Sequence, residues 1–330
     1  MIRLTWLQFR TQAAVAAAAL VIGAIALAVT GPHLAHLYAG GGTVTCRAGG
    51  ICPGADTGKD LSLLVIAVPG IVGLFWGAPL VARELETHSY RLAWTQGVTR
   101  TRWLAVKLAV VGVASMTAAG LVSLMVTWWA GPIDSATADQ WSTLSQRDII
   151  PAGSAAFAFT LGVTVGLLIR RTVPAMAVTL VAFTLGQFAM TAAGPHLITP
   201  LHSTTAVSTA SLQATGVTGD GRLFVVPAPV SIPGAWLLSP SRQCGMTASC
   251  DVITASGQSA ASLPATRACT PAGTGRACDA YIAALHLRQV VTYQPGHRYW
   301  IFQWYETAIY LALSVILVAV CFWEIRRRIT

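Results

Sequence analysis

Residues 83–103, with the sequence RELETHSYRLAWTQGVTRTRW, form the one substantial charged block between two long apolar runs. The block contains two Glu, four Arg and two Trp, and the apolar runs end at Ala82 and begin at Leu104. Because about 20 predominantly apolar residues in a helix cross a bilayer, both flanking runs are long enough to span a membrane. The charged block must therefore lie on one membrane face, where a partner can contact it.

The composition places the whole chain in a membrane. Of its 330 residues, 54% are hydrophobic and 10% are charged, whereas about 25% of residues are charged in soluble domains. The net charge of +9 does not indicate nucleic acid binding, because the basic residues flank apolar runs instead of clustering with aromatic residues. The absence of Asn and the presence of only two Lys favour a bacterial source with a GC-rich genome, and hence the plasma membrane.

Six segments are long and apolar enough to span the bilayer, so the expected fold class is an all-α integral membrane protein. The predicted spans are 11–30, 61–82, 104–130, 151–169, 173–193 and 300–323. The first could instead be a secretory signal peptide, because Arg3 and Arg10 precede an Ala-rich run. Its apolar stretch exceeds the length of about 7 to 15 residues that is usual for a signal core, so we interpret it as a retained helix.

Basic residues predict the orientation of these spans. Twelve of the 21 Lys and Arg fall on one side, within short loops and tails, and nine are spread over more than 150 residues on the other. By the positive-inside rule, both termini are cytoplasmic, and the loops 31–60, 131–150 and 194–299 face outward. The twelve are Arg3, Arg10, Arg83, Arg91, Arg100, Arg102, Lys107, Arg170, Arg171, Arg326, Arg327 and Arg328.

Six of the seven cysteines fall in the outward loops, which indicates disulfides. Several connectivities are open, and the simplest joins sequence neighbours; an external zinc site is the alternative, but it lacks a C-x-x-C pair. The loop 194–299 is too long for a bare connection and should be an extracellular subdomain with its own structure. It separates the domain 1–193 from the last span and basic tail, 300–330. The neighbour pairs are Cys46–Cys52, Cys244–Cys250 and Cys269–Cys278.

Ionisable residues and prolines inside spans are the next candidates for special roles. Glu306 is the only acidic residue well inside a predicted span, in its outer third, and intramembrane charges often face a partner or a polar pathway. It is either a gate or substrate contact, or a structural residue paired with Arg298 or with loop backbone. Lys107 can snorkel to the interface. Pro69 and Pro79 predict a kink in the second span.

A stripe of side chains in the fifth span could contact substrate. Thr179, Phe183 and Gln187 are spaced by four residues, which places them along one helical face. Phe75 and Trp76 of the second span could oppose them. Such a cavity would suit a small amphipathic molecule, although stripes of this kind more often serve helix packing.

Sequence motifs for catalysis are absent. The chain has no G-x-x-x-x-G-K-[ST] nucleotide loop, no G-x-S-x-G and no H-E-x-x-H, so neither an enzymatic role nor a cofactor or metal of its own is expected. The two halves of the chain show no internal similarity, which weakens the case for a secondary transporter built from inverted repeats.

Four blocks of the sequence resemble a known family. They are LTWLQFRTQ at 4–12, APLVARELETHSYRLAWTQGVTRTRWLAVKLA at 78–109, RRTVPAMAVTL at 170–180, and YQPGHRYWIFQWYETAIYLAL at 293–313 with EIRRR at 324–328. In these blocks the chain resembles the six-span permease subunits of actinobacterial ABC-2 type exporters. Most of 194–299 carries no such resemblance.

The resemblance implies a transporter in which two permease chains, identical or related, form the pathway and two separate ABC ATPase subunits bind ATP and Mg. A short coupling helix between the second and third spans would dock into the ATPase, here around residues 87–97. The alternative is a solvated surface loop. The candidate coupling residues are Glu84, Glu86, Arg91, Leu92, Trp94, Gln96 and Arg100.

Two other functions remain open from the sequence. A secondary transporter or channel would place ionisable residues near the middle of the bilayer, where only Glu306, toward the outer side, comes close. A membrane-anchored sensor would bind a ligand through its external loop and signal through the charged block. The protein that contacts this block would distinguish an exporter from a sensor.

Overall fold

The computed structural model describes residues 2–39, 65–87, 99–137, 141, 144–217, 222–227, 232–238, 252–254, 256–260, 263, 269 and 276–328. The chain divides into a helical unit, Met1–Leu197 with Tyr299–Thr330, and a second unit, Ile198–Arg298. The predicted boundaries of the external subdomain were 194 and 299. Each unit is described by itself.

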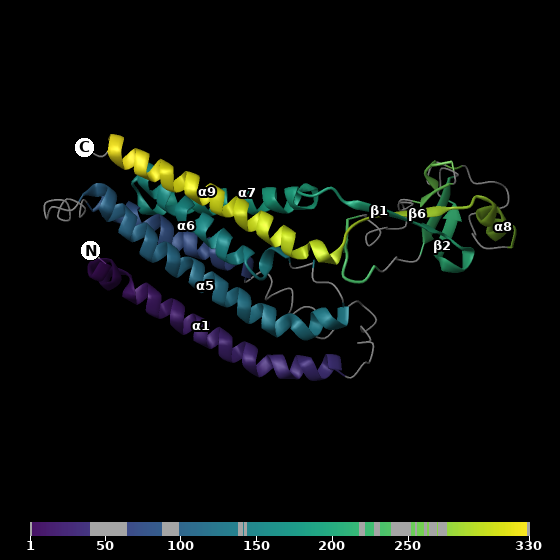
Figure 1. Ribbon diagram of the computed structural model, residues 1–330, viewed down its shortest axis with the longest axis horizontal. Helices are drawn as coiled ribbons and strands as arrows, with labels where there is room; N and C mark the ends of the chain where they lie inside the picture. The colour runs from purple at the N-terminus through teal and green to yellow at the C-terminus, as the bar shows by residue number, and fades with distance from the viewer. Residues whose placement is uncertain are drawn as a thin grey trace. The chain divides into compact units, whose positions relative to one another are not determined.

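The helical unit contains six helices that are long and apolar enough to cross a membrane, within the residues described (Figure 1). Each predicted span coincides with one of them, so the expectation of six apolar helices of membrane length is confirmed. They are α1 (Ile2–Ala39), a broken helix made of 65–72, the π-helical turn η1 (Gly73–Gly77) and α3 (Ala78–Glu86), α5 (Arg100–Thr137), α6 (Ile150–Ile169), α7 (Thr172–Ala193) and α9 (Tyr299–Arg328).

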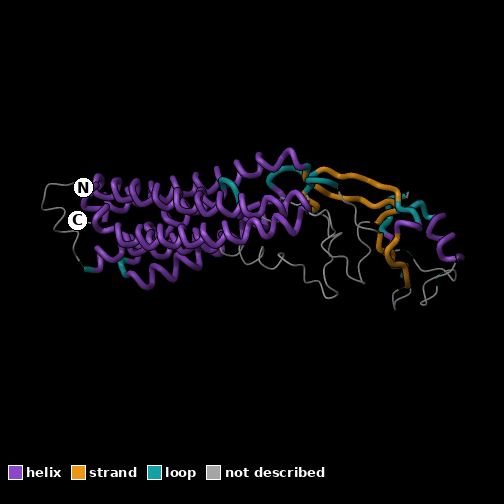
Figure 2. Tube along the Cα trace, turned by 90° about the horizontal axis from the view of Figure 1, so that it is seen from below, coloured by secondary structure: helices purple, strands orange, loops and turns teal. Residues whose placement is uncertain are grey.

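Helix α6 occupies the centre of this unit. It packs against α5, α7, α9 and the broken helix, whereas α1 packs against α5. Of its 20 residues, 14 are buried, as expected for a helix that is apolar on all sides. The helices run side by side, and both chain termini lie at the same end of the bundle (Figures 1 and 2).

Two G-x-x-x-G sequences meet where the broken helix crosses α6. One is Gly73–Gly77, and the other is 162–166. The absence of side chains lets the two backbones touch: a Cβ added at Gly162 would collide with the carbonyl oxygen of Gly73 and lie 2.7 Å from the backbone nitrogen of Ala78. Small residues allow this close approach between membrane helices. The crossing fixes the position of the broken helix against the central helix.

A π-helical turn, η1, lies between Pro69 and Pro79, in the span for which these prolines predict a kink. The Ala78 N–H donates to the carbonyl oxygen of Gly73, five residues earlier. In a regular α-helix, the ring of Pro79 would clash with the carbonyl group four residues before it. The wider π turn changes the hydrogen-bond register just before this proline.

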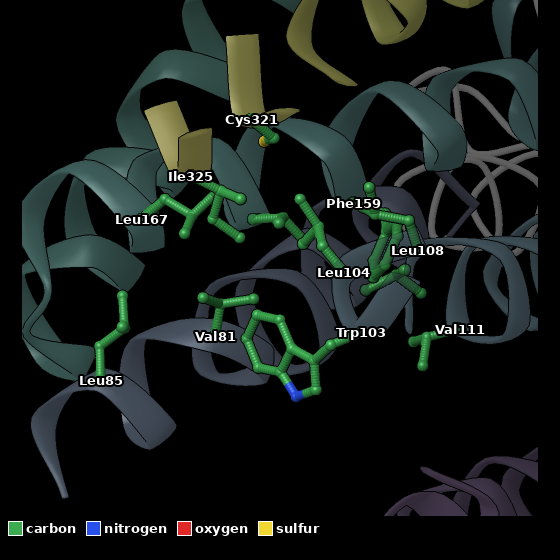
Figure 3. Packing of buried hydrophobic residues seen from close by; sticks show 12 residues of the cluster. Val81, Leu85, Trp103, Leu104, Leu108, Val111, Phe159, Leu167, Cys321 and Ile325 are labelled. Carbon is green, nitrogen blue, oxygen red and sulfur yellow. The ribbon is translucent and has the colours of Figure 1, made fainter. Parts of the chain in front are cut away.

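A cluster of buried apolar side chains joins α3, α5, α6 and α9 (Figure 3). We call it the core cluster. It includes Leu85 from the end of α3 and Trp103 from the start of α5, which are 8% and 4% exposed. Both ends of the charged block are therefore anchored in the bundle. The labelled members are Val81, Leu85, Trp103, Leu104, Leu108, Val111, Phe159, Leu167, Cys321 and Ile325.

The second unit contains β-structure. Strand β6 (Arg288–Gln294) pairs antiparallel with β1 (Leu201–Ala206) on one edge, and with β4 (Trp236–Leu237) and β5 (Val252–Ile253) on the other. Strands β2 (Leu212–Val217) and β3 (Leu223–Pro227) form a separate antiparallel pair. The all-α expectation is therefore wrong for this unit. Helix α8 (Arg276–Ala284) precedes strand β6 in this unit.

A disulfide links α8 to the core of the second unit. Cys269 and Cys278 are bonded, with their Cα atoms 4.7 Å apart, and they correspond to one of the three neighbour pairs expected from the sequence. Both are buried with Leu223, Val225 and Ile282. The other cysteines expected to pair, Cys46, Cys52, Cys244 and Cys250, lie outside the described residues.

The helix crossing generates the first prediction. Gly162→Ala forces a methyl group against the backbone of the broken helix and should destabilise the protein by about 1–3 kcal/mol, as overpacking does in other cores. Gly120→Ala is the matched control, because its nearest new contact is a Cβ at 3.9 Å. Reversible unfolding in mixed micelles measures both variants. Equal stability of the two would contradict the close backbone contact.

Candidate functional site

The charged block begins at the last turn of α3 and ends in the first turn of α5. Its described parts are 83–87 and 99–103, at the end of the bundle that carries both termini (Figure 1). Arg100 is the first residue of α5 and is partly buried. The predicted coupling residues Arg91, Leu92, Trp94 and Gln96 lie outside the described residues. The structure therefore shows how the two ends of this block are attached to the bundle.

Glu84 attaches α3 to α5 through an ion pair. Its carboxylate contacts the ammonium group of Lys107, whose side chain is 3% exposed. The same ammonium lies 4.6 Å from the centre of the Trp103 ring, a distance that allows cation–π attraction. The expectation that Lys107 snorkels to the interface is therefore wrong. The lysine is held inside the bundle, because a carboxylate and an aromatic ring compensate for its lost hydration.

Glu86 attaches the same turn of α3 to α7. Its Oε2 accepts hydrogen bonds from the Thr172 hydroxyl at 2.7 Å and from the Thr172 backbone N–H at 3.1 Å. Thr172 is the first residue of α7, where backbone N–H groups have no helical acceptors and the helix dipole favours a negative charge. The contact is reinforced by close packing of the small residues Ala78, Ala82 and Ala175.

The two carboxylates reach different helices because of their spacing. Residues two apart in an α-helix point about 200° away from each other. Glu84 is therefore directed to α5, and Glu86 to α7. A displacement of this single helical turn would be transmitted to both neighbours.

The predicted substrate stripe of α7 faces the interior of the bundle. Thr179 is 1% exposed, and its hydroxyl donates to the carbonyl oxygen of Ala175 in the same helix. Phe183, which is 4% exposed, lies over Gly70 of the broken helix. Gln187 accepts a hydrogen bond of 3.3 Å from the Tyr310 hydroxyl. The stripe is thus in contact with the broken helix and α9.

The structure does not place Phe75 and Trp76 opposite this stripe. The side chain of Phe75 is 51% exposed, whereas Trp76 packs against the core cluster. The residue of the broken helix that meets Phe183 is Gly70. The π-helical turn shifts the helical register between these positions, so regular spacing could not predict their faces.

Glu306 is buried near the other end of the bundle. It is 2% exposed and accepts a hydrogen bond of 3.4 Å from the Ser145 hydroxyl, and Gly194 packs against its Oε1. The proposed pairing with Arg298 is not observed, since the Arg298 guanidinium donates to the Thr199 carbonyl and to Gln294. Glu306 belongs to a polar cluster at this end of α9.

Sequence reasoning missed three features of this site. The two G-x-x-x-G motifs could have been recognised in the sequence, because this spacing inside an apolar segment indicates helix association. The role of Lys107 was indicated by its position inside a span, which calls for a counter-charge. Only Thr172 had no recognisable signal, because its partner Glu86 is 86 positions away in the sequence.

The ion pair between α3 and α5 generates the second prediction. Glu84→Gln leaves the buried ammonium of Lys107 without its carboxylate and should destabilise the protein by about 3–5 kcal/mol. Adding Lys107→Met removes both charges and should recover most of this loss. Glu86→Gln is the exposed control and should have a much smaller effect. Unfolding in mixed micelles checks the series, and a double variant no more stable than Glu84→Gln would refute the pairing.

Comparison with known proteins agrees with this architecture. The family model described as ABC-2 membrane transporter related matches residues 17–193, which is more than half of the 330-residue chain. The matched region begins in α1 and includes the broken helix, α5, α6 and α7. No curated protein and no solved structure matches the chain. The family match and the six membrane-length helices show that this chain is a multi-pass membrane protein that belongs to the ABC-2 membrane transporter related family.

Proposed function

We propose that this chain is the permease subunit of an ATP-driven ABC exporter in a bacterial plasma membrane. Two permease chains, identical or related, would form the pathway, and two separate ABC ATPase subunits would bind ATP and Mg. The family supports the role of a transport component. The observation that carries the coupling proposal is the attachment of one turn of α3 to both α5 and α7 by Glu84 and Glu86.

The end of the bundle with both termini would face the cytoplasm. The charged block and the Arg170–Arg171 turn lie at this end (Figure 1), and the same end holds most of the basic residues in short loops and tails. Residues 88–98 would contact the ATPase, with Leu92 and Trp94 as apolar anchors and Arg91 as a charged neighbour. An apolar centre with a polar rim is the usual composition of a specific protein interface.

Closure of the ATPase subunits would push the charged block and move the last turn of α3. Leu85 and Trp103 fix both ends of the block in the core cluster. The ion pair between Glu84 and Lys107 would carry the displacement to α5. The hydrogen bonds from Thr172 to Glu86 would carry it to α7. Coupled movement of packed helices is a common form of conformational switching.

Movement of α7 would open the substrate pathway. Thr179 and Phe183 of its stripe are buried, and the partly buried Gln187 is bonded to Tyr310. We therefore propose that the stripe contacts a small amphipathic substrate only after α7 shifts against the broken helix. Other side chains of α7 are apolar and exposed, including Val181 at 60% and Phe188 at 69%. They would face lipid or the second permease chain. The unit Ile198–Arg298 would lie outside the membrane.

Capture of partner proteins tests this proposal. The full chain is purified from native membranes with an affinity tag, and bound proteins are identified by mass spectrometry. We expect an ABC ATPase to co-purify, and the double substitution Arg91→Ala with Trp94→Ala to reduce its yield by about tenfold or more, because interface anchors carry most of the binding energy. Arg326→Ala is the control, since it removes an exposed basic residue elsewhere at the same end.

The outcome distinguishes the competing functions. Recovery of a kinase or regulator in place of an ATPase would support a sensor, and the export proposal would fail. Ion-driven transport by the purified chain alone would support a secondary transporter. Undiminished ATPase recovery with the double variant would show that the docking site lies outside 88–98.

A further inference from the structure

Glu306 has fewer hydrogen-bond donors than a buried carboxylate requires. Its Oε1 contacts the Ser145 hydroxyl at 3.4 Å, and its Oε2 has no partner among the described residues. The side chain is 2% exposed. A carboxylate buried in this way is costly unless a counter-charge or further donors compensate for its lost hydration.

Gln303, one turn earlier in α9, directs a second unpartnered oxygen into the bundle. It is fully buried, and its amide nitrogen donates to the carbonyl oxygen of Leu144 at 2.9 Å and to the Tyr299 hydroxyl at 3.1 Å. Because a carbonyl can only accept, this contact fixes the orientation of the amide. The Tyr299 hydroxyl in turn donates to Asp148 at 2.6 Å. The amide oxygen Oε1 of Gln303 is left without a donor in the described part of the chain.

Thr307 supplies a third oxygen. Hydroxyl groups elsewhere in the spans donate to the carbonyl four residues earlier, as Thr164, Thr179 and Ser314 do at 2.7 Å. The hydroxyl of Thr307 is buried and makes no such bond, and its methyl group faces Gly153 of α6. Its oxygen is thus available to a ligand.

These three oxygens belong to one face of α9, because positions 303, 306 and 307 are three and four residues apart. Gln303 and Glu306 contact consecutive residues of the 3₁₀ turn η2 (Leu144–Gln146), namely Leu144 and Ser145. Gly194 lies beside Glu306 Oε1 and, as a glycine, has no side chain to cover it. The unpartnered oxygens of Gln303 and Glu306 are acceptors, whereas the Thr307 hydroxyl can also donate. The buried cation nearest in sequence to η2 is Arg147. One added proton could satisfy only one of the two acceptors.

We propose that Glu306, Gln303 and Thr307 form a binding site for a small monovalent cation, such as an alkali ion. Carboxylate, amide and hydroxyl oxygens are ligands for hard cations, and a single carboxylate matches a single positive charge better than the several carboxylates that Ca²⁺ sites use. The burial of all three side chains excludes a bulky substrate in this conformation. A bound ion would be held by three side chains of α9, two of which already contact η2.

Direct ion binding tests the proposal. The full chain in lipid nanodiscs is titrated with radioactive sodium or rubidium ion, with choline chloride holding the ionic strength constant. We expect saturable binding of one ion per chain. Glu306→Gln should weaken it by at least about tenfold, since loss of even an outer-shell group weakens metal sites by about ten- to hundredfold.

The control variant is Glu324→Gln, a second buried acid of α9, which should leave the affinity unchanged. If Glu306→Gln does not fold, Thr307→Val removes only a hydroxyl oxygen and should still weaken binding severalfold. Absence of saturable binding to the unmodified chain would overturn the proposal. So would binding by the Glu306 and Thr307 variants that is as tight as binding by the unmodified chain. Thermal unfolding of the same nanodisc samples is a second measurement. If the stability of the chain changed with pH but not with the concentration of sodium or rubidium ion, a proton would be the only ligand and the proposal would be overturned.

Discussion

Contact between the backbones of the broken helix and α6 is the constraint on which the helical unit depends. Helices inside a bilayer gain little from the hydrophobic effect when they associate, so close packing must hold them together. Glycines on both helices provide this packing, and each would lose it with the addition of one methyl group. The π-helical turn lies at this crossing. The residues that join the two helices therefore also set the direction in which α3 continues from the crossing.

The direction of α3 determines what the charged block can do. Its last turn lies between α5 and α7, and the alternate positions Glu84 and Glu86 reach one helix each. A flexible loop on the bundle surface would absorb a push from a partner. Here Leu85, near the start of the block, and Trp103, at its end, are buried in the core cluster, and the last turn of α3 is bonded to α5 and α7. The proposed coupling to an ATPase rests on these attachments at the two described ends of the block.

The sequence predicted the six spans well, because apolar length is a local property that the bilayer imposes. It also identified Glu84 and Glu86 as important, but it assigned both to an external partner, whereas the structure shows internal bonds to Lys107 and Thr172. Pairings between distant segments could not be read from spacing. The faces of Phe75 and Trp76 were misjudged because both residues lie within a π turn. The short strands β1, β4 and β5 pair with β6, which is distant in the sequence.

The pair between Glu84 and Lys107 has a consequence for how the chain enters the membrane. A lysine within a span opposes insertion by about 2.5–3.5 kcal/mol at the centre of a helix and by less toward its ends. The counter-charge lies on the preceding span, so the broken helix and α5 lower this barrier when they leave the insertion machinery together as a hairpin. Insertion of these two spans would then be favoured as a pair, with the charged lysine neutralised before it meets lipid.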